Sequence, residues 1–291
     1  YLGILSQLVS SYLTKPKLKA ILYDFDDTLI DWSGCTRNWR DINQRHISLV
    51  FDYVKSNVYP LADRDRFSET FHKLTFQAWT EAKQTLRTPH IGQLLMDTCA
   101  NLGVPRRVLK INELMDAYEW KTVEGVIPFP ETIDTLRYID MLGIKQGMIT
   151  NAYAPMSMRW REVESYGLDQ YLFRDGCISA ADVGYLKPDP RIFEAALERL
   201  QVQPNEIVFI GDSREADLAG AQNFCMKAIL RVNVYTTRTD MPSVFPYKIV
   251  PNAEITSLKD IYAYFDDWYD GWRANTPKTS FPLQSLEESR P

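Results

Sequence analysis

Short apolar runs alternate with segments of helical spacing through the second half of the chain. Runs of strand length lie at residues 146–150, 176–179, 206–212, 227–232 and 248–250. Segments whose apolar residues recur at helical intervals lie beside them, at residues 130–142, 155–166, 191–200, 215–224 and 258–268. This alternation of strand and helix predicts an α/β fold, with a parallel sheet covered by helices on both faces.

A further strand of the same sheet is expected at residues 20–23. It opens the stretch ILYDFDDTLID, residues 21–31, in which an apolar run is followed by four carboxylates and a threonine. Two carboxylates about 4 Å apart repel by roughly 4 kcal/mol at an effective dielectric constant near 20, and burial adds to this cost. A bound cation, a shared proton or a nucleophilic role for one carboxylate would offset it. A solvated turn with scattered acids is the alternative.

The pattern between residues 32 and 124 is helical throughout. Segments of helical spacing lie at residues 37–53, 64–87, 90–102 and 105–121. Pro60, Pro89 and Pro105 lie between these segments, where a helix must end. We therefore expect a helical insert that separates the first strand from the rest of its sheet.

The two ends of the chain lie outside this pattern. Residues 1–13 are mildly apolar without a basic leader, and they predict a helix instead of a signal peptide. Residues 271–291 lack periodicity and predict a loop. The expected division of the chain is an N-terminal extension at 1–18, a core at 19–31 and 125–268, a helical insert at 32–124, and a tail at 269–291.

The composition is that of an ordinary globular protein. The 291 residues are 45% hydrophobic and 24% charged, and the formal net charge is -5. This balance, without a long basic run, argues against a nucleic-acid surface, and the apolar runs are too short for a membrane-spanning helix. The four cysteines are far apart in the sequence, which favours a reducing compartment. A cytoplasmic location is expected, held provisionally because the chain begins at Tyr1 and not at Met. The pattern says nothing of the oligomeric state.

Polar side chains follow the strands of the predicted sheet. Because the carboxyl ends of parallel strands lie along one edge, these side chains are expected to converge there. They are Asp24, Asp26 and Thr28 after the first strand, Thr150 and Asn151 after the second, Lys187 in GYLKPDP, and Asp212, Ser213 and Asp217 in the stretch GDSREAD.

Each of these groups suits a step of phosphoryl transfer. A cluster of oxygen ligands without His or Cys suits Mg²⁺, and Asp24 could attack phosphorus to form an acyl-phosphate. Asp26 could protonate the leaving alcohol and then deprotonate the hydrolytic water. Thr150 and Asn151 could donate hydrogen bonds to the phosphoryl oxygens, while Lys187 supplies a positive charge.

The chain resembles the haloacid dehalogenase (HAD) superfamily. The matching motifs are DFDDT at residues 24–28, the strand that ends in Thr150, the lysine of LKPDP (Lys187), and GDSREAD at residues 211–217, and the resemblance covers most of residues 19–232. It implies a Rossmann-like core with an α-helical cap inserted after the first motif.

The resemblance also implies roles for individual residues. Asp24 would be the nucleophile and Asp26 the acid and base. Magnesium would be held by the Asp24 side chain, the Asp26 backbone carbonyl and Asp212, with Asp217 assisting directly or through water. Asp217 could otherwise be an acid of the first helical turn.

Two residues of the first motif, Asp26 and Asp27, distinguish this chain within the resembled family. Family members often have Gly where this chain has Asp27, so Asp27 is expected to shape the turn and not to take part in catalysis. The dehalogenating and phosphonate-cleaving branches lack an acid at the position of Asp26, which therefore favours phosphate-ester chemistry. Ser213 is expected to be a helix cap more than a catalytic group.

The helical insert corresponds to a mobile cap in the resembled class. Hinges are expected near residues 31–34 and 125–128, and closure would exclude water from the site. Four cap residues near the first strand are candidate contacts to the leaving group: Trp32, Arg37, Trp39 and Arg40. The histidines His46, His72 and His90 lack the spacing of metal ligands and are expected to be packing or surface residues.

The predicted function is a Mg²⁺-dependent phosphatase that hydrolyses a small phosphorylated metabolite through an aspartyl-phosphate on Asp24. One alternative is a phosphomutase of the same fold, which uses the same two aspartates. The other is a non-catalytic HAD-like binding or scaffold protein. The sequence does not name the substrate.

Overall fold

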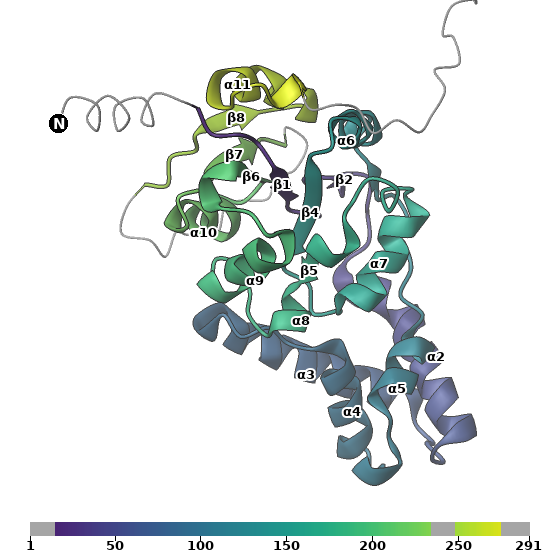
Figure 1. The fold of residues 1–291 in the computed structure, drawn as a ribbon. Coiled ribbons are helices and arrows are strands. Elements are labelled where there is room, and N and C mark those ends of the chain that lie inside the picture. The colour runs from purple at the N-terminus through teal and green to yellow at the C-terminus, as the bar shows by residue number, and fades with distance from the viewer. Residues whose placement is uncertain (1–14, 234–247, 275–291) are drawn as a thin grey trace, which may run out of the picture.

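The computed structural model describes residues 15–233 and 248–274. Within them, six strands form one parallel sheet in the order β5-β4-β1-β6-β7-β8 (Figure 1). The strands are β1 (Ala20–Tyr23), β4 (Lys145–Thr150), β5 (Cys177–Ser179), β6 (Ile207–Gly211), β7 (Lys227–Arg231) and β8 (Ala253–Ile255). The predicted Rossmann-like α/β fold is confirmed.

Strand β1 lies in the middle of the sheet, although it is first in the sequence. Tyr23 is in register with Met148 of β4 on one side and Ile210 of β6 on the other. The next residue continues this pairing, because the Asp24 N–H donates to the Ile210 carbonyl at 2.8 Å. The backbone of Asp24 is therefore fixed at the carboxyl edge of the sheet.

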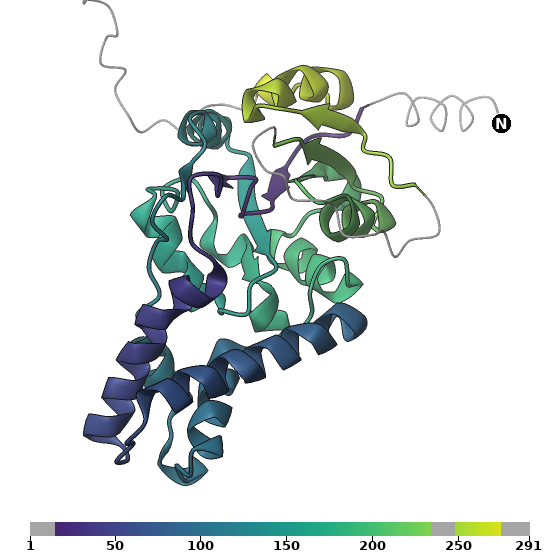
Figure 2. The same ribbon diagram turned by 180° about the vertical axis from the view of Figure 1, so that it is seen from behind.

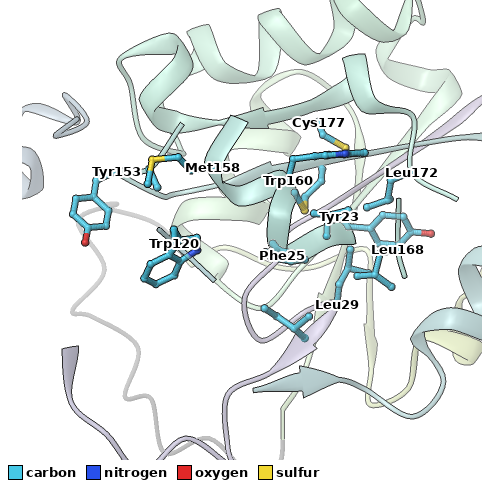
Figure 3. Packing of buried hydrophobic residues seen from close by; sticks show 14 of the residues in the cluster. Tyr23, Phe25, Leu29, Trp120, Tyr153, Met158, Trp160, Leu168, Leu172 and Cys177 are labelled. Carbon is cyan, nitrogen blue, oxygen red and sulfur yellow. The ribbon is translucent and has the colours of Figure 1, made fainter. Parts of the chain in front are cut away.

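Helices cover both faces of the sheet, as Figures 1 and 2 show from opposite sides. Ile21 and Tyr23 of β1 belong to a buried cluster with residues of α6 (Thr132–Met141), α7 (Met156–Ser165) and α11 (Ile261–Trp268). Ala20 and Leu22 belong to a second cluster, with residues of α8 (Ala180–Val183), α9 (Pro190–Leu200) and α10 (Ala219–Asn223). The alternation follows from the two-residue period of a strand. Figure 3 shows part of the first cluster, with Tyr23 of β1, Trp160 of α7 and Cys177 of β5 among its members.

The insert forms a group of four helices below the sheet in Figures 1 and 2, which we call the cap helices. They are α2 (Trp39–Asn57), α3 (Arg64–Thr85), α4 (Ile91–Asn101) and α5 (Ile111–Tyr118). Aromatic residues such as Phe51, Phe67 and Phe71 are buried among them. Most of the aromatic content of the insert is therefore packing.

A two-stranded antiparallel ribbon joins the two ends of the insert. Its strands are β2 (Ile30–Asp31) and β3 (Ile127–Pro128), with Ile30 opposite Pro128. Beside the ribbon, Gly34 and Gly125 approach so closely that a Cβ on Gly125 would lie 2.2 Å from the Gly34 carbonyl oxygen. The two connections are therefore held together where hinges are predicted.

Short helical turns complete the described chain. They are η1 (Arg106–Val108), η2 (Arg174–Gly176), η3 (Pro204–Glu206), η4 (Arg214–Leu218), η5 (Leu258–Asp260) and η6 (Trp272–Ala274), of which η4 is a π-helical turn. None of the helices in the described part has the length and apolar character needed to cross a membrane.

Two predictions of secondary structure are wrong. The last strand is β8 and not residues 248–250, because Val250 is exposed and pairing with β7 begins at Asn252, whose N–H donates to the Ala228 carbonyl at 2.8 Å. The expected loop after residue 270 contains η6, where Trp272 is buried against the core. The helix expected at residues 1–13 and the tail from 275 onward lie outside the described residues.

Candidate active site

Three neighbouring strands bring the predicted site residues to one edge of the sheet. Asp24 follows β1, Thr150 ends β4 and Asp212 follows β6, and β1 lies between the other two strands. Lys187 and Asp217 reach the same place from the segments after α8 and β6. The convergence expected from the strand ends is therefore observed.

Lys187 is the positive centre of this cluster. Its Nζ lies 2.5 Å from Asp24 Oδ1 and 2.7 Å from Asp217 Oδ1, and it donates to the Ile149 carbonyl at 2.8 Å. Burial alone lowers the pKa of Lys187, but the two carboxylates more than offset this and raise it above the ordinary lysine value. The side chain is therefore a fixed cation.

Three carboxylates meet around this lysine. Oxygen atoms of Asp24, Asp212 and Asp217 all lie within 4.8 Å of one another. Burial raises the pKa of Asp24 to about 7, although Lys187 acts against the shift, and burial also raises the pKa of Asp212 well above its usual value. A divalent cation would stabilise all three as carboxylates, and this oxygen-only set of donors is compatible with Mg²⁺.

The close approach of Asp217 depends on the residue at the end of β6. A Cβ on Gly211 would lie 2.3 Å from Asp217 Oδ2, so that only glycine leaves room for this carboxylate. The same oxygen accepts a hydrogen bond from the Ser213 N–H at 3.0 Å. Ser213 caps the following turn through its hydroxyl, which accepts from the Ala216 N–H at 3.1 Å, and its prediction as a cap is confirmed.

Asp26 lies at the same edge and is held by three other side chains. Arg159 Nη2 donates to both carboxylate oxygens at 2.9 Å. Trp32 Nε1 donates to Oδ1 at 2.8 Å, and Thr150 Oγ1 donates to Oδ2 at 3.3 Å. The carboxylate is 28% exposed, while the Arg159 side chain is only 4% exposed. Asp26 is therefore fixed in direction and still reachable from solvent.

Arg159 was not predicted from the sequence. It lies on α7 between the buried residues Met158 and Trp160, whereas Arg161, two positions on, is exposed and pairs with Asp116. Charged and apolar residues alternate along α7, whose sequence is MSMRWREVES, and this gives no signal for one buried charge. Because both arginines belong to the same short helix, the pattern alone could not tell which one was buried.

Asp27 shapes the turn, as predicted. Its φ of 60° lies in the left-handed region, which suits glycine and is tolerated by aspartate. Its N–H donates to the Ile30 carbonyl at 2.8 Å, and its carboxylate accepts from the Trp32 N–H at 3.3 Å. This conformation explains why a glycine would also fit the position.

Asn151 is close to the cluster but is engaged with the backbone. Its Oδ1 accepts from the Lys187 N–H at 2.7 Å, and its Nδ2 donates to the Lys187 carbonyl at 3.2 Å. In this arrangement the amide holds the segment that carries the lysine. Phosphate binding by Asn151 stays a prediction.

The four candidate cap residues lie in different surroundings. Trp32 contacts Asp26 and packs on Trp39, with ring centroids 5.3 Å apart. Arg37 is exposed and pairs with Glu124 at 2.6 Å, and Arg40 is also exposed. The structure therefore brings Trp32 to the acidic cluster, with Trp39 behind it. Substrate contacts by all four stay a prediction.

Comparison with known proteins identifies the family. The model of the haloacid dehalogenase-like hydrolases matches residues 18–224. The chain belongs to this family. The haloacid dehalogenase-like chain is 28% identical over 246 residues to a glyceraldehyde 3-phosphate phosphatase of Methanothermobacter thermautotrophicus, covering 84% of this chain and 99% of that protein. It is 29% identical over 226 residues to (S)-2-haloacid dehalogenase 4A of Burkholderia cepacia, covering 74% and 83%.

Solved structures agree on the fold of this family member. A 2-haloacid dehalogenase of Pseudomonas syringae pv. Tomato superposes with a TM-score of 0.56 at 22% identity, covering 86% of this chain and 99% of that one. A HAD phosphatase of Thermococcus onnurineus gives 0.51 at 23% identity, covering 85% and 98%. The resemblance stated from the motifs is confirmed, and the protein is a hydrolase of the HAD superfamily.

Proposed function

We propose that this HAD hydrolase is a phosphatase that acts on a small soluble phosphomonoester. The observation that carries the proposal is the second acid of the first motif, Asp26, held beside the cluster of Asp24, Asp212 and Asp217. When an alkyl phosphate is cleaved, the departing alkoxide needs a proton, which a carboxyl group at this position can supply. A relative in Methanothermobacter thermautotrophicus is named a phosphatase, which supports the same class.

Asp24 is the nucleophile in this proposal. One of its carboxylate oxygens forms a bond to phosphorus as the bond between phosphorus and the leaving oxygen breaks, giving an aspartyl-phosphate and an alcohol. Lys187 lies 2.5 Å from Asp24 Oδ1, so its charge is already in place for the phosphoryl oxygens. The Thr150 hydroxyl, and the Asn151 amide if it leaves Lys187, can donate to the same oxygens.

Asp26 moves the proton in both half-reactions. It gives a proton to the departing alkoxide, and it then takes one from the water that attacks the aspartyl-phosphate. The second step breaks the bond between phosphorus and Asp24, releases inorganic phosphate and restores both side chains. A partly exposed carboxylate suits this exchange, since it must meet substrate and water in turn.

Magnesium would be held by the side chains of Asp24, Asp212 and Asp217 and by the Asp26 backbone carbonyl. When bound, the ion supplies positive charge that reduces repulsion between the carboxylates and the phosphate. The cap, residues 32–124, would close over this edge and exclude bulk water. Trp32 is the best placed of its four candidate residues, because it already contacts Asp26.

The first test is phosphate release from a panel of substrates, with and without Mg²⁺. The panel holds nucleoside monophosphates, sugar phosphates, phosphoglycolate, glyceraldehyde 3-phosphate and an aryl phosphate, with 2-chloropropionate as a haloacid. We expect metal-dependent phosphate release that falls by at least roughly 10³-fold in Asp24→Asn. Asp27→Asn, which removes a neighbouring charge and keeps the turn, is the matched control and should stay active.

The alternatives give other products. A phosphomutase would return an isomeric sugar phosphate with little free phosphate, and a dehalogenase would release chloride from 2-chloropropionate. A binding or scaffold protein would turn over nothing in the panel. Activity of Asp24→Asn near that of the parent would contradict the role of Asp24 as nucleophile.

A further inference from the structure

An ionic network that the motifs do not include lies beneath Asp26. Arg159 Nη2 contacts both oxygens of Asp26, and Arg159 Nη1 contacts Glu162 Oε2 at 2.8 Å, one turn along α7. The Glu162 side chain is fully buried. The guanidinium group therefore lies between two carboxylates, one at the candidate active site and one in the interior.

The network continues into the segment that returns from the cap helices. Trp120 Nε1 donates to Glu162 Oε2 at 2.7 Å, and Trp120 lies two residues beyond the end of α5. The same indole stacks on Trp39 of α2, with ring centroids 6.5 Å apart. The guanidinium also lies over the ring of Phe25, 4.9 Å from Arg159 Cζ to the centroid, and Phe25 and Trp120 are both labelled in Figure 3. Arg159 is thus fixed from the core and from the cap side together.

Stability alone is a poor reason for this arrangement. Burying a guanidinium and a carboxylate costs several kcal/mol per ion, and apolar residues of similar volume often do as well or better. Within the described residues, Arg159 Nε is buried without a hydrogen-bond partner, which adds to the cost. The burial of Arg159 and Glu162 is explained if their network fixes the orientation of the Asp26 carboxylate.

We propose that Arg159 is a positioning residue that orients the Asp26 carboxylate for proton transfer and is itself held by Glu162 and Trp120. The inference rests on the proposed phosphatase function and deepens it. One guanidinium nitrogen, Nη2, meets both oxygens of Asp26 while the other, Nη1, is held by Glu162, so the planar group is fixed at both ends, which a single ammonium group cannot reproduce. Trp32 and Thr150 also donate to Asp26.

The test separates an orienting role from a structural one through the leaving group. An aryl phosphate departs with little help from an acid, whereas an alkyl phosphate needs the proton. The measured quantity is kcat/KM, which reports only the steps up to departure of the leaving group, because hydrolysis of the aspartyl-phosphate is common to both substrates. We expect Arg159→Gln to lower kcat/KM for alkyl phosphates by roughly ten- to a hundredfold, part of the roughly 10²- to 10⁴-fold that a positioned acid supplies. We expect a loss of less than about threefold in kcat/KM for the aryl substrate.

Further variants locate the effect at Asp26. Asp26→Asn should show the same dependence on the leaving group, and adding Arg159→Gln to it should cost little more, because the two residues act as one unit. Arg159→Lys keeps the charge without the second nitrogen that Glu162 holds, and it should recover only part of the activity. Trp120→Phe keeps the ring without the N–H and should lose about two- to fivefold on alkyl phosphates alone. Arg161→Gln removes an exposed guanidinium from the same helix and should behave like the parent.

Each outcome bears on one of the two proposals. An equal loss of kcat/KM on aryl and alkyl substrates in Arg159→Gln, with Asp26→Asn still selective, would overturn the positioning role and leave the phosphatase standing. Loss of the leaving-group dependence in Asp26→Asn itself would instead contradict the acid and base role. If Arg159→Gln does not fold because Glu162 is left unpaired, Arg159→Gln/Glu162→Gln removes both charges and replaces it. Selective loss on alkyl phosphates in that pair supports the proposal, and wild-type activity in it would overturn it.

Discussion

Single atoms decide whether the carboxylates of this site can meet. Asp217 reaches Asp24 because Gly211 has no Cβ, and Asp27 forms its turn because aspartate tolerates a positive φ. The acids at the strand ends could be predicted from the sequence, since parallel strands place them together. Arg159 could not, because its burial is a property of how α7 packs and not of its neighbours in the chain.

The Gly211 position gives a prediction at this scale. In Gly211→Ala the new Cβ would displace the Asp217 carboxylate from a contact of 2.3 Å. We expect the Mg²⁺ affinity to fall by roughly 10- to 100-fold, as when a supporting contact of a metal ligand is lost. Titration calorimetry with Mg²⁺ measures it. If the effect acts through Asp217, Gly211→Ala in an Asp217→Asn background adds little, and full additivity of the two would contradict the explanation.

At the level of elements, most strands of the parallel sheet were easier to predict than the last strand and the short helix α8. Buried parallel strands appear as short apolar runs between helices, and five of the six were located in this way. The sixth was misplaced because residues 248–250 are apolar enough for a strand, while only the pairing partner Ala228 sets where β8 begins. The four-residue α8 was missed, because so short a helix has no periodicity to detect.

Helix α2 gives a prediction about pH. His46 packs on Tyr118 with ring centroids 5.0 Å apart, and its Nδ1 contacts the Tyr118 carbonyl at 2.8 Å. Burial lowers the pKa of His46 below 6.5, with Arg45 and Lys121 acting in the same direction and the Tyr118 carbonyl and Glu119 against it. As the pH falls through 6.5 the unfolded chain gains a proton that the folded chain resists. The stabilising contribution is therefore present above that pH and lost below it.

The measurement compares His46→Gln with the parent by urea unfolding between pH 7.5 and 5.5. The difference in free energy of unfolding between the two proteins should shrink as the pH falls, because the glutamine does not titrate. The comparison with the parent is needed because Glu162 also titrates in this range. Burial raises the pKa of Glu162 to about 7, although Arg159 acts against the shift. Glu162 therefore makes the stability of both proteins fall as the pH rises from 4.5 to 7. A difference that is constant over this range would refute the role of His46.

At the scale of the whole molecule, the cap helices are joined to the core on two sides. The Leu186 N–H donates to the Leu86 carbonyl at 2.8 Å, and the Thr88 N–H donates to the Gly184 carbonyl at 3.1 Å, so the end of α3 is bonded to the segment beside Lys187. The β2–β3 ribbon joins the other side. Cap position and the lysine segment are therefore linked through the backbone.

The ribbon gives a prediction at this scale. Gly125→Ala would force a Cβ into the Gly34 carbonyl at a residue whose φ is +86°. We expect kcat and KM to change together, as hinge substitutions do, with a loss of about 1–3 kcal/mol in stability. Gly143→Ala is the control, because it has a similar φ of +71° with open space around its Cβ and lies away from the cap. Equal effects of both substitutions on KM would contradict a hinge role.

The central place of β1 has a consequence for how the protein is made. Its partners start at residue 145 in β4 and residue 207 in β6, so a ribosome must add the whole insert before the strand can pair on one side, and most of the core before it can pair on both. At a synthesis rate of roughly 5–20 residues per second, the apolar stretch waits on the order of ten seconds or more. The cap helices, whose contacts are nearer in sequence, can form in that interval. A nascent chain of this protein should therefore carry a folded helical bundle and an unpaired, aggregation-prone strand, which makes it a natural client for a chaperone at the ribosome.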